Sequence, residues 1–259
     1  NPQNSARTCK TYQVDAYLVN GFNPFDAEKH ENTNHGLAKK LNEIFSKWKK
    51  KGHIKFNAFA GYNFDFLLTS HTWFSNLYTF PWLFSSNAVQ MDTLPIARNM
   101  EYYRSDILKT ELNKKNNKIF KLSSLCTLNG FPIEKAHTSR DDTLGLKNLT
   151  EHLYKQDSEL FNKNLQFLNK ANVLPYVKSL KYFYTTETFF GKTRQFACCF
   201  LTEHSVYQGY ILSFDLKNNP EEIFTASSNQ ELQKILFATP VKMRTIKSGR
   251  IPLILKPDE

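Results

Sequence analysis

The sequence has no long apolar run, and this excludes the simplest routes to a membrane or to secretion. Charged residues interrupt every hydrophobic stretch before it reaches the ~18 apolar residues that a membrane-spanning helix needs. Residues 1–7 carry no apolar core of the kind that marks a secretory signal peptide. We therefore expect a cytoplasmic protein with no membrane partner.

Cysteine is scarce, and its pattern predicts neither a disulfide framework nor a zinc site. The chain of 259 residues has four cysteines, with no Cys-x-x-Cys pair and no histidine at zinc-ligand spacing. Cys198 and Cys199 are neighbours, so on a strand their side chains point to opposite faces and rarely pair. Reduced thiols are expected.

Acidic residues are outnumbered by basic ones. Thirty-four Lys and Arg against 24 Asp and Glu give a net charge of +10 and a pI near 9.3. Such a surface favours polyanions, because each neutralised phosphate releases condensed counterions. The lysines also fit a compositional bias in a chain rich in Asn, Phe and Ile, so charge alone leaves both interpretations open. Apolar residues make up 41% of the chain, which is enough for a folded core.

Strands and helices alternate in the first 156 residues, and this order predicts a layered α/β domain. Apolar runs bounded by turn residues predict strands over 11–19, 53–60 and 89–92. Helical spacing of apolar residues predicts helices over 34–51, 64–79, 93–100, 122–128 and 142–155. A charged, polar loop is expected over 111–118.

The last third of the chain changes character. A helical connector is expected over 157–172, and β-branched and aromatic residues then dominate four segments separated by Gly, Asn and Pro. These segments are 180–190, 195–202, 205–215 and 240–255. They predict a small all-β barrel. The composition shift divides the chain near residue 157, into domains 1–156 and 157–259.

Three short segments of the first domain carry residues suited to hydrolytic chemistry. GYNFD (61–65) and MDTLPIAR (91–98) each place a carboxylate after a buried strand, and HTSRDD places His137 five residues before Asp142. Acids at a sheet edge can converge on divalent metals, and a nearby histidine can take a proton from metal-bound water. Each acid also has a structural interpretation, because an Asp at a helix start is most often an N-cap.

These segments, together with KLSSLCTLNGFPIEKAHTSRDD (121–142), resemble the later motifs of the DEDDh 3′→5′ exonucleases. The likeness is greatest to the bacterial exodeoxyribonuclease I group. VNGFNPFDAEKHENTN (19–34) and ATPVKMRTIKSGRIPLIL (238–255) extend it over about residues 11–256. The resemblance implies a ribonuclease H-like exonuclease domain followed by an SH3-like barrel domain. It also implies a monomer that degrades single-stranded DNA, as in DNA repair.

The resemblance also implies a metal centre. The family holds two Mg²⁺ ions with four carboxylates while a histidine activates the attacking water. Carried over, Asp65 and Asp142 would be metal ligands and His137 the general base. Asp92 falls where the family often has a structural Asp, so it is not expected to bind metal.

The family's first motif, Asp-x-Glu at the end of the first strand, is not found where it is expected. Asp26 and Glu28 fit the letters, but they lie on a loop or helix start, in a stretch that aligns downstream of the motif. Asp157 and Glu159 fall at the domain boundary. We therefore expect a chain truncated at both ends, beginning about fifty residues into the family pattern, without the first strand and with little or no activity.

Basic residues are candidate phosphate contacts. Lys121 stands where the family has a basic residue near the DNA, and the resemblance places four others along a basic channel. These four are Lys192, Arg194, Lys242 and Arg244. Each also fits an ordinary solvated cation. Preference for single strands would come from stacking and channel width, not from base reading.

Two alternatives stay open. A non-catalytic, single-stranded nucleic-acid-binding protein that has lost its metal site would fit the missing first motif. Asp65, His137 and Asp142 count against it. A relative acting on short RNA is a third possibility, but its small family members lack a barrel, so residues 173–259 count against it.

Overall fold

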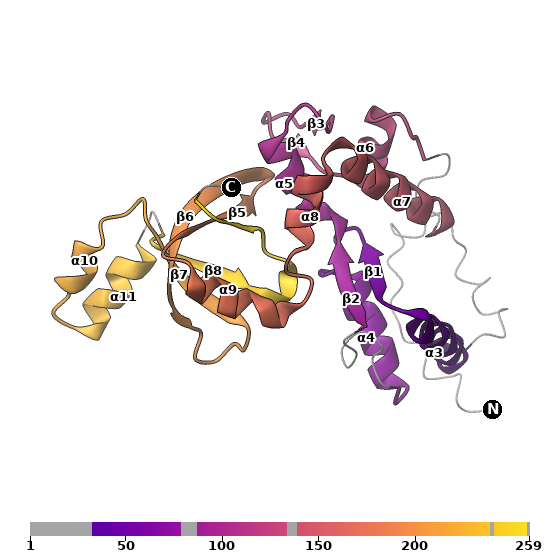
Figure 1. The fold of residues 1–259 in the computed structure, drawn as a ribbon, viewed down its shortest axis with the longest axis horizontal. Helices are drawn as coiled ribbons and strands as arrows, with labels where there is room; N and C mark the ends of the chain where they lie inside the picture. The colour runs from indigo at the N-terminus through magenta and orange to yellow at the C-terminus, as the bar shows by residue number, and fades with distance from the viewer. Residues whose placement is uncertain (1–32, 79–86, 134–138, 239–240, 258–259) are drawn as a thin grey trace.

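The computed structural model describes residues 33–78, 87–133, 139–238 and 241–257 (Figure 1). The strand predicted over 11–19 and the Asp26 and Glu28 pair lie outside these ranges, and so does His137. Within them, no helix is both long enough and apolar enough to cross a bilayer.

The first part of the chain combines helices with a parallel strand pair and a short hairpin. In chain order its elements are α3 (Asn34–Lys51), β1 (Ile54–Ala58), α4 (Asp65–Ser75), β2 (Ala88–Asp92), α5 (Thr93–Tyr103), β3 (Glu111–Leu112), β4 (Lys118–Ile119), α6 (Leu122–Leu128), α7 (Ser139–Gln156) and α8 (Ser158–Leu165). The helices and strands predicted within the described residues are thus confirmed, with ends that differ by a few residues.

Strands β1 and β2 pair in parallel, with Ile54 opposite Ala88 and Ala58 opposite Asp92. Helices α4 and α5 follow the carboxyl ends of these strands, so both begin at the same edge of the sheet. Helix α3 covers the pair through Phe45, whose ring stacks on Trp73 of α4 and meets Phe56 of β1 edge-on. This edge is where the sequence places the GYNFD and MDTLPIAR segments.

The second part is built on a five-stranded antiparallel sheet in the order β8-β7-β6-β5-β9. Its elements are η2 (Lys170–Asn172), α9 (Val173–Ser179), β5 (Phe183–Phe189), β6 (Lys192–Glu203), β7 (Tyr210–Asp215), α10 (Glu221–Phe224), α11 (Asn229–Phe237), β8 (Met243–Lys247), η3 (Ser248–Arg250) and β9 (Ile254–Leu255). Figure 1 shows α10 and α11 at the far end of the sheet from α5.

The second part is not all-β, which corrects the prediction. Helix α9 buries Val173 and Val177 against the sheet, and α10 and α11 interrupt the strands. Ser228 caps α11, because its Oγ accepts from Glu231 N, and the Glu231 carboxylate accepts from Ser227 N, one residue before the cap. The pattern Ser-x-x-Glu was therefore present in the sequence.

The segment 111–118 also differs from the loop that was predicted. Strands β3 and β4 pair antiparallel. Asn113 Oδ1 accepts from Lys115 N and Asn117 N, and Asn116 takes a positive φ of 59°. Asparagine tolerates that conformation better than most residues, so it can close a tight turn despite the high charge of the segment.

Two hydrophobic clusters form the core. The first contains Met100, Leu149 and Phe161 from the α/β part, and also Ile251 from near the end of the chain. The second contains Phe167 and the inner face of the five-stranded sheet. Along the chain, Phe161 belongs to the first cluster and Phe167 to the second. The domain boundary near residue 157 stays a prediction.

Candidate functional site

Asp92 holds the edge of the parallel pair together. It is buried, and its Oδ1 accepts from Ala60 N at 2.8 Å and from Leu94 N at 3.1 Å, while Oδ2 accepts from Tyr62 N at 3.3 Å. Burial raises the pKa of Asp92, and these hydrogen bonds oppose the rise. Because both carboxylate oxygens of Asp92 accept hydrogen bonds from backbone N–H groups, its expected structural role is confirmed.

Gly61 allows the turn that leads to Asp65. A Cβ at this position would lie 2.4 Å from Ala58 Cβ and 2.9 Å from the Phe66 ring, so no other residue fits without a shift. The turn ends where α4 begins with Asp65, which is exposed. The local sequence therefore presents this carboxylate to solvent beside the edge of the sheet.

Asp142 lies in the first turn of α7, and a polar network attaches that helix to the strand pair. Asn57 Nδ2 donates to Thr150 Oγ1 at 3.0 Å, and Thr93 Oγ1 donates to Asn57 Oδ1 at 2.8 Å. Near the start of α7, burial and then the charge of Asp142 raise the pKa of the Cys126 thiol to about 11. Asp142 is thus close to α6.

The described residues do not by themselves form a metal centre. Among them, no three His, Cys, Asp or Glu side chains are grouped so that they could hold an ion. Asp65 begins α4, Asp142 lies in the first turn of α7, and His137 lies outside the described ranges. No two-ion site is therefore complete within the described ranges, and the convergence of positions 65, 137 and 142 stays a prediction.

The five predicted phosphate contacts fall into two groups. Lys121, Lys192 and Arg194 are exposed, and none forms an ion pair with a carboxylate that the structure describes. Lys242 is buried and forms an ion pair with Glu222.

Arg244 is also engaged within the chain. Its guanidinium pairs with Asp215 at 3.1 Å and with Glu187 at 3.3 Å, and it lies 3.7 Å above the centre of the Phe196 ring. Burial raises the pKa of Glu187, and Arg244 opposes that rise. The charge of Arg244 is therefore largely balanced, which the sequence could not show because these partners lie 29 and 57 residues away.

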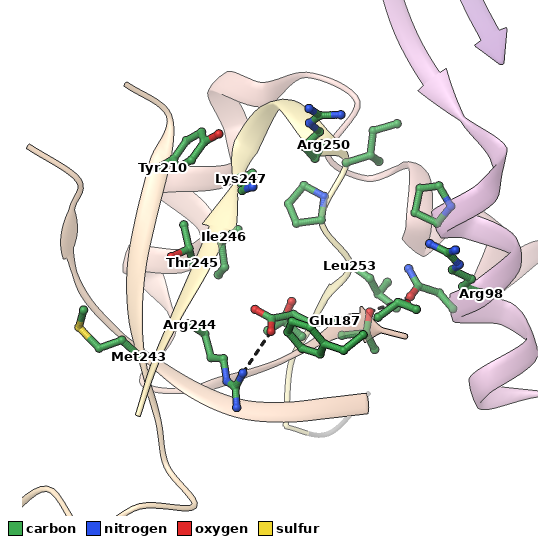
Figure 2. Close-up of a pocket in the computed structure, with 18 of the residues that line it drawn as sticks. Arg98, Glu187, Tyr210, Met243, Arg244, Thr245, Ile246, Lys247, Arg250 and Leu253 are labelled. Atoms are coloured by element: carbon green, nitrogen blue, oxygen red, sulfur yellow. Dashed lines mark hydrogen bonds and ion pairs between the residues drawn. The ribbon is translucent and has the colours of Figure 1, made fainter. Parts of the chain in front are cut away.

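A cavity of about 840 Å³ lies between α5 and the five-stranded sheet; we refer to it as the basic cavity. Arg98 contributes from the α5 side and Lys247, Arg250 and Tyr210 from the sheet side, and the ion pair of Glu187 with Arg244 also lines the cavity (Figure 2). The predicted contact set omitted Arg98, Lys247 and Arg250, although all three stand in segments that carry the family resemblance.

The basic cavity adjoins the edge described above. The Arg250 guanidinium carbon lies 5.0 Å from the centre of the Tyr62 ring, and Tyr62 belongs to the GYNFD turn. Tyr62 also donates from its hydroxyl to the Gln90 carbonyl. Burial and then the nearby Asp92 charge raise the pKa of Tyr62 well above its ordinary value, while Arg250 opposes the rise.

The arrangement of a parallel strand edge, flanking helices and a separate antiparallel sheet matches solved structures of exonuclease I. No family model matches the chain, and a search of curated proteins finds no match. Escherichia coli exonuclease I in complex with a dA16 oligonucleotide matches with a TM-score of 0.77 and 17% identity, over 94% of this chain and 54% of that one. The zinc-bound form of the E. coli exonuclease I–single-stranded DNA complex gives the same values.

A product-bound structure of exonuclease I matches with a TM-score of 0.73 and 16% identity, over 94% of this chain and 53% of that one. The chain therefore has an exonuclease I-like fold, and it spans about half the length of these neighbours. At this identity the likeness establishes the fold alone.

Proposed function

We propose that the protein is an exonuclease I-like 3′→5′ exodeoxyribonuclease that acts on single-stranded DNA. The match over 94% of the chain to an exonuclease I structure with a bound oligonucleotide supports this most directly. The sequence resemblance points to the same group from independent observations, the order of its motifs. Since the neighbours are about twice as long, the activity of a complete enzyme is part of the proposal.

Mg²⁺ is the proposed cofactor, with Asp65 and Asp142 as ligands and His137 as the general base. A divalent ion would supply charge stabilisation at the phosphodiester and a reactive water. Among the described residues, Asp65 lies in the first turn of α4 and Asp142 in the first turn of α7. Gly61 and Asp92 shape the turn before Asp65, and the Asn57, Thr93 and Thr150 network anchors the helix that carries Asp142.

For DNA binding we propose Lys121, Lys192 and Arg194 as phosphate contacts, because their charges are exposed. Lys242 and Arg244 were predicted for the same role. Their ion pairs with Glu222, Glu187 and Asp215 favour a structural role instead, since a phosphate would have to compete with a carboxylate already in place.

A second candidate is a single-stranded nucleic-acid-binding protein without catalysis. One observation favours it: among the described residues no group of three metal donors is found. The exposed carboxylate of Asp65 at the sheet edge favours the enzyme.

The test is the release of mononucleotides from 3′-labelled single-stranded DNA, with added Mg²⁺ and with EDTA. We expect slow release that requires Mg²⁺, that Asp142→Ala abolishes, and that the neighbouring control Asp141→Ala retains. Oligonucleotide binding without release under any divalent ion would contradict the enzyme and favour the second candidate.

A further inference from the structure

Helix α3 carries a row of apolar side chains on its outer side, formed by Leu37, Leu41, Ile44 and Trp48; we refer to it as the α3 seam. These residues follow one another at steps of four, three and four, so they lie along one side of the helix. Leu37 is 47% exposed, Ile44 39% and Trp48 49%. Single exposed apolar residues are ordinary, but a continuous row of them marks a surface for an interaction.

The packing of α3 on the rest of the protein uses a different side of the helix. Ala38 is buried, the Phe45 ring stacks on Trp73 of α4, and Asn42 accepts a hydrogen bond from Trp73 Nε1. Ala38 and Phe45 each come directly after a seam residue, so they form one border of the seam. The α3 seam therefore lies beside the contact with α4 and is not used by it.

Lysines form the other border. Lys40 and Lys47 each come directly before a seam residue, and both side chains are exposed. Three further lysines, at 49–51, end the helix, where cations interact favourably with the helix dipole. Lys40 and Lys47 lie before that last turn. If the seam residues take positions a and d of a coiled-coil repeat, these two lysines take position g, whose charge selects the partner helix.

Helix α3 carries half of the net charge of the chain. Its six lysines and one glutamate give +5, with histidine neutral, out of +10 for all 259 residues. A surface of this sign attracts an acidic partner and repels a second copy of itself. Figure 1 shows α3 on the far side of β1 and β2 from the five-stranded sheet, so this charge lies apart from the basic cavity.

We propose that the α3 seam binds an amphipathic helix of a partner protein, in which acidic residues border an apolar row of the same spacing. The apolar row packs on the seam, and the carboxylates pair with Lys40 and Lys47. The seam is about 17 Å long at a rise of ~1.5 Å per residue, so about three turns of the partner cover it. A contact of this size suits a reversible association. The proposal goes beyond the proposed function and does not depend on it.

A lipid surface and a second copy fit the seam less well. A helix that lies on a membrane inserts a wide apolar face with cations around it. One border of the α3 seam is instead packed on α4 through Phe45, so the exposed apolar row is narrow and is the width that another helix covers. In a pair of seams from two copies, the +5 of one helix would face the +5 of the other.

The test measures the binding of a designed helical peptide to the full chain by fluorescence anisotropy. The peptide has about three heptads with leucine at a and d and glutamate at e and g, and the glutamates keep it from pairing with itself. Trp48→Ala is expected to weaken binding about tenfold, because the largest side chain of the seam is lost. Lys40→Glu/Lys47→Glu should weaken it at least as much. This double variant should bind instead a peptide with lysine at e and g.

The matched control is Lys39→Glu/Lys50→Glu. Both lysines are exposed on the same helix, but helical spacing places them on the side away from the seam. The change in net charge is the same, so binding should fall far less than in the seam variant. Phe74→Ala removes an exposed ring of α4 outside the seam and should leave binding unchanged. Circular dichroism checks that each variant is folded.

Several outcomes would overturn the proposal. These are no binding of the glutamate peptide, equal losses in the seam variants and the controls, and equal binding of the lysine peptide by the unchanged chain. Binding of phosphatidylglycerol vesicles without binding of the peptide would overturn it in favour of a lipid surface. Self-association in sedimentation velocity that Trp48→Ala abolishes would overturn it in favour of a second copy. None of these measurements involves DNA hydrolysis, so this proposal and the proposed function can fail separately.

Discussion

Gly61 is the residue on which the geometry of the candidate edge depends most directly. A side chain here would overlap Ala58 and Phe66. We expect Gly61→Ala to lower the free energy of unfolding by ~1–3 kcal/mol, because the strand end or the Phe66 ring must shift. Urea denaturation measures this change. Gly249→Ala is the control, since a Cβ there would have no atom within 4 Å; an equal loss in both variants would contradict the argument.

Glu187 gives a pH dependence with a definite sign. Burial raises its pKa above the ordinary value of a glutamate, with Arg244 and Lys247 opposing and Asp215 adding to the rise. A raised pKa means that the folded state binds the proton more tightly. Its contribution to stability is therefore complete below pH ~4.3 and is lost as the pH rises through the folded-state pKa.

Glu187→Gln removes this titration. Its free energy of unfolding, measured in urea over a pH series, should fall less steeply above pH ~4.3 than that of the wild type. Identical slopes for the two proteins would show that Glu187 does not titrate differently in the folded state.

Sequence reasoning at the residue scale worked where the partner is near in the chain. The structural role of Asp92 was implied by the family resemblance and by the N-cap preference of an Asp at a helix start, and one of its three partners, Leu94, is two residues away. Lys242 was different, because whether a lysine is free depends on carboxylates that only the fold brings close. Glu222, 20 residues earlier, comes from a helix that was not predicted.

At the scale of elements, Asn99 connects three of them. It donates to Asn164 of α8 at 2.8 Å and accepts from Thr186 of β5 at 2.7 Å, so α5 is tied both to α8 and to the five-stranded sheet. Asn99→Ala leaves the buried Asn164 and the half-buried Thr186 without this partner, and we expect the free energy of unfolding to fall by ~1–3 kcal/mol. Thermal denaturation with the exposed control Asn148→Ala tests this; a loss no larger than in the control would contradict it.

Elements with strong local signals were predictable, and those set by short polar contacts were not. Helix α3 follows from a Thr33 cap, apolar spacing and a basic end before Gly52. Helix α11 has only nine residues, and the Ser228 cap at its start is a weak signal by itself, so this helix was not predicted. The candidate site divides in the same way, since the segments at 61–65 and 91–98 were found but Lys247 and Arg250 of the basic cavity were not among the predicted contacts.

At the scale of the whole molecule, the two parts share interior surface. The first hydrophobic cluster takes Ile251 from the second part, and it also contains Phe161 of α8, which lies beyond residue 156. We therefore expect a chain that ends at residue 156 to expose apolar surface, to bind the dye ANS and to melt without a cooperative transition. The full chain is the control. A cooperative transition in the shorter chain would show instead that residues 1–156 fold as an independent domain.

Ile251 also bears on the order of events during synthesis. Its side chain completes the first cluster although it lies 86 residues after Leu165, the last residue of α8. A ribosome adds residues one at a time, so the α/β part emerges well before the isoleucine that closes its interior. Until Ile251 is synthesised, the α/β part remains partly folded with exposed apolar surface, and in this state it is open to chaperone binding and to aggregation.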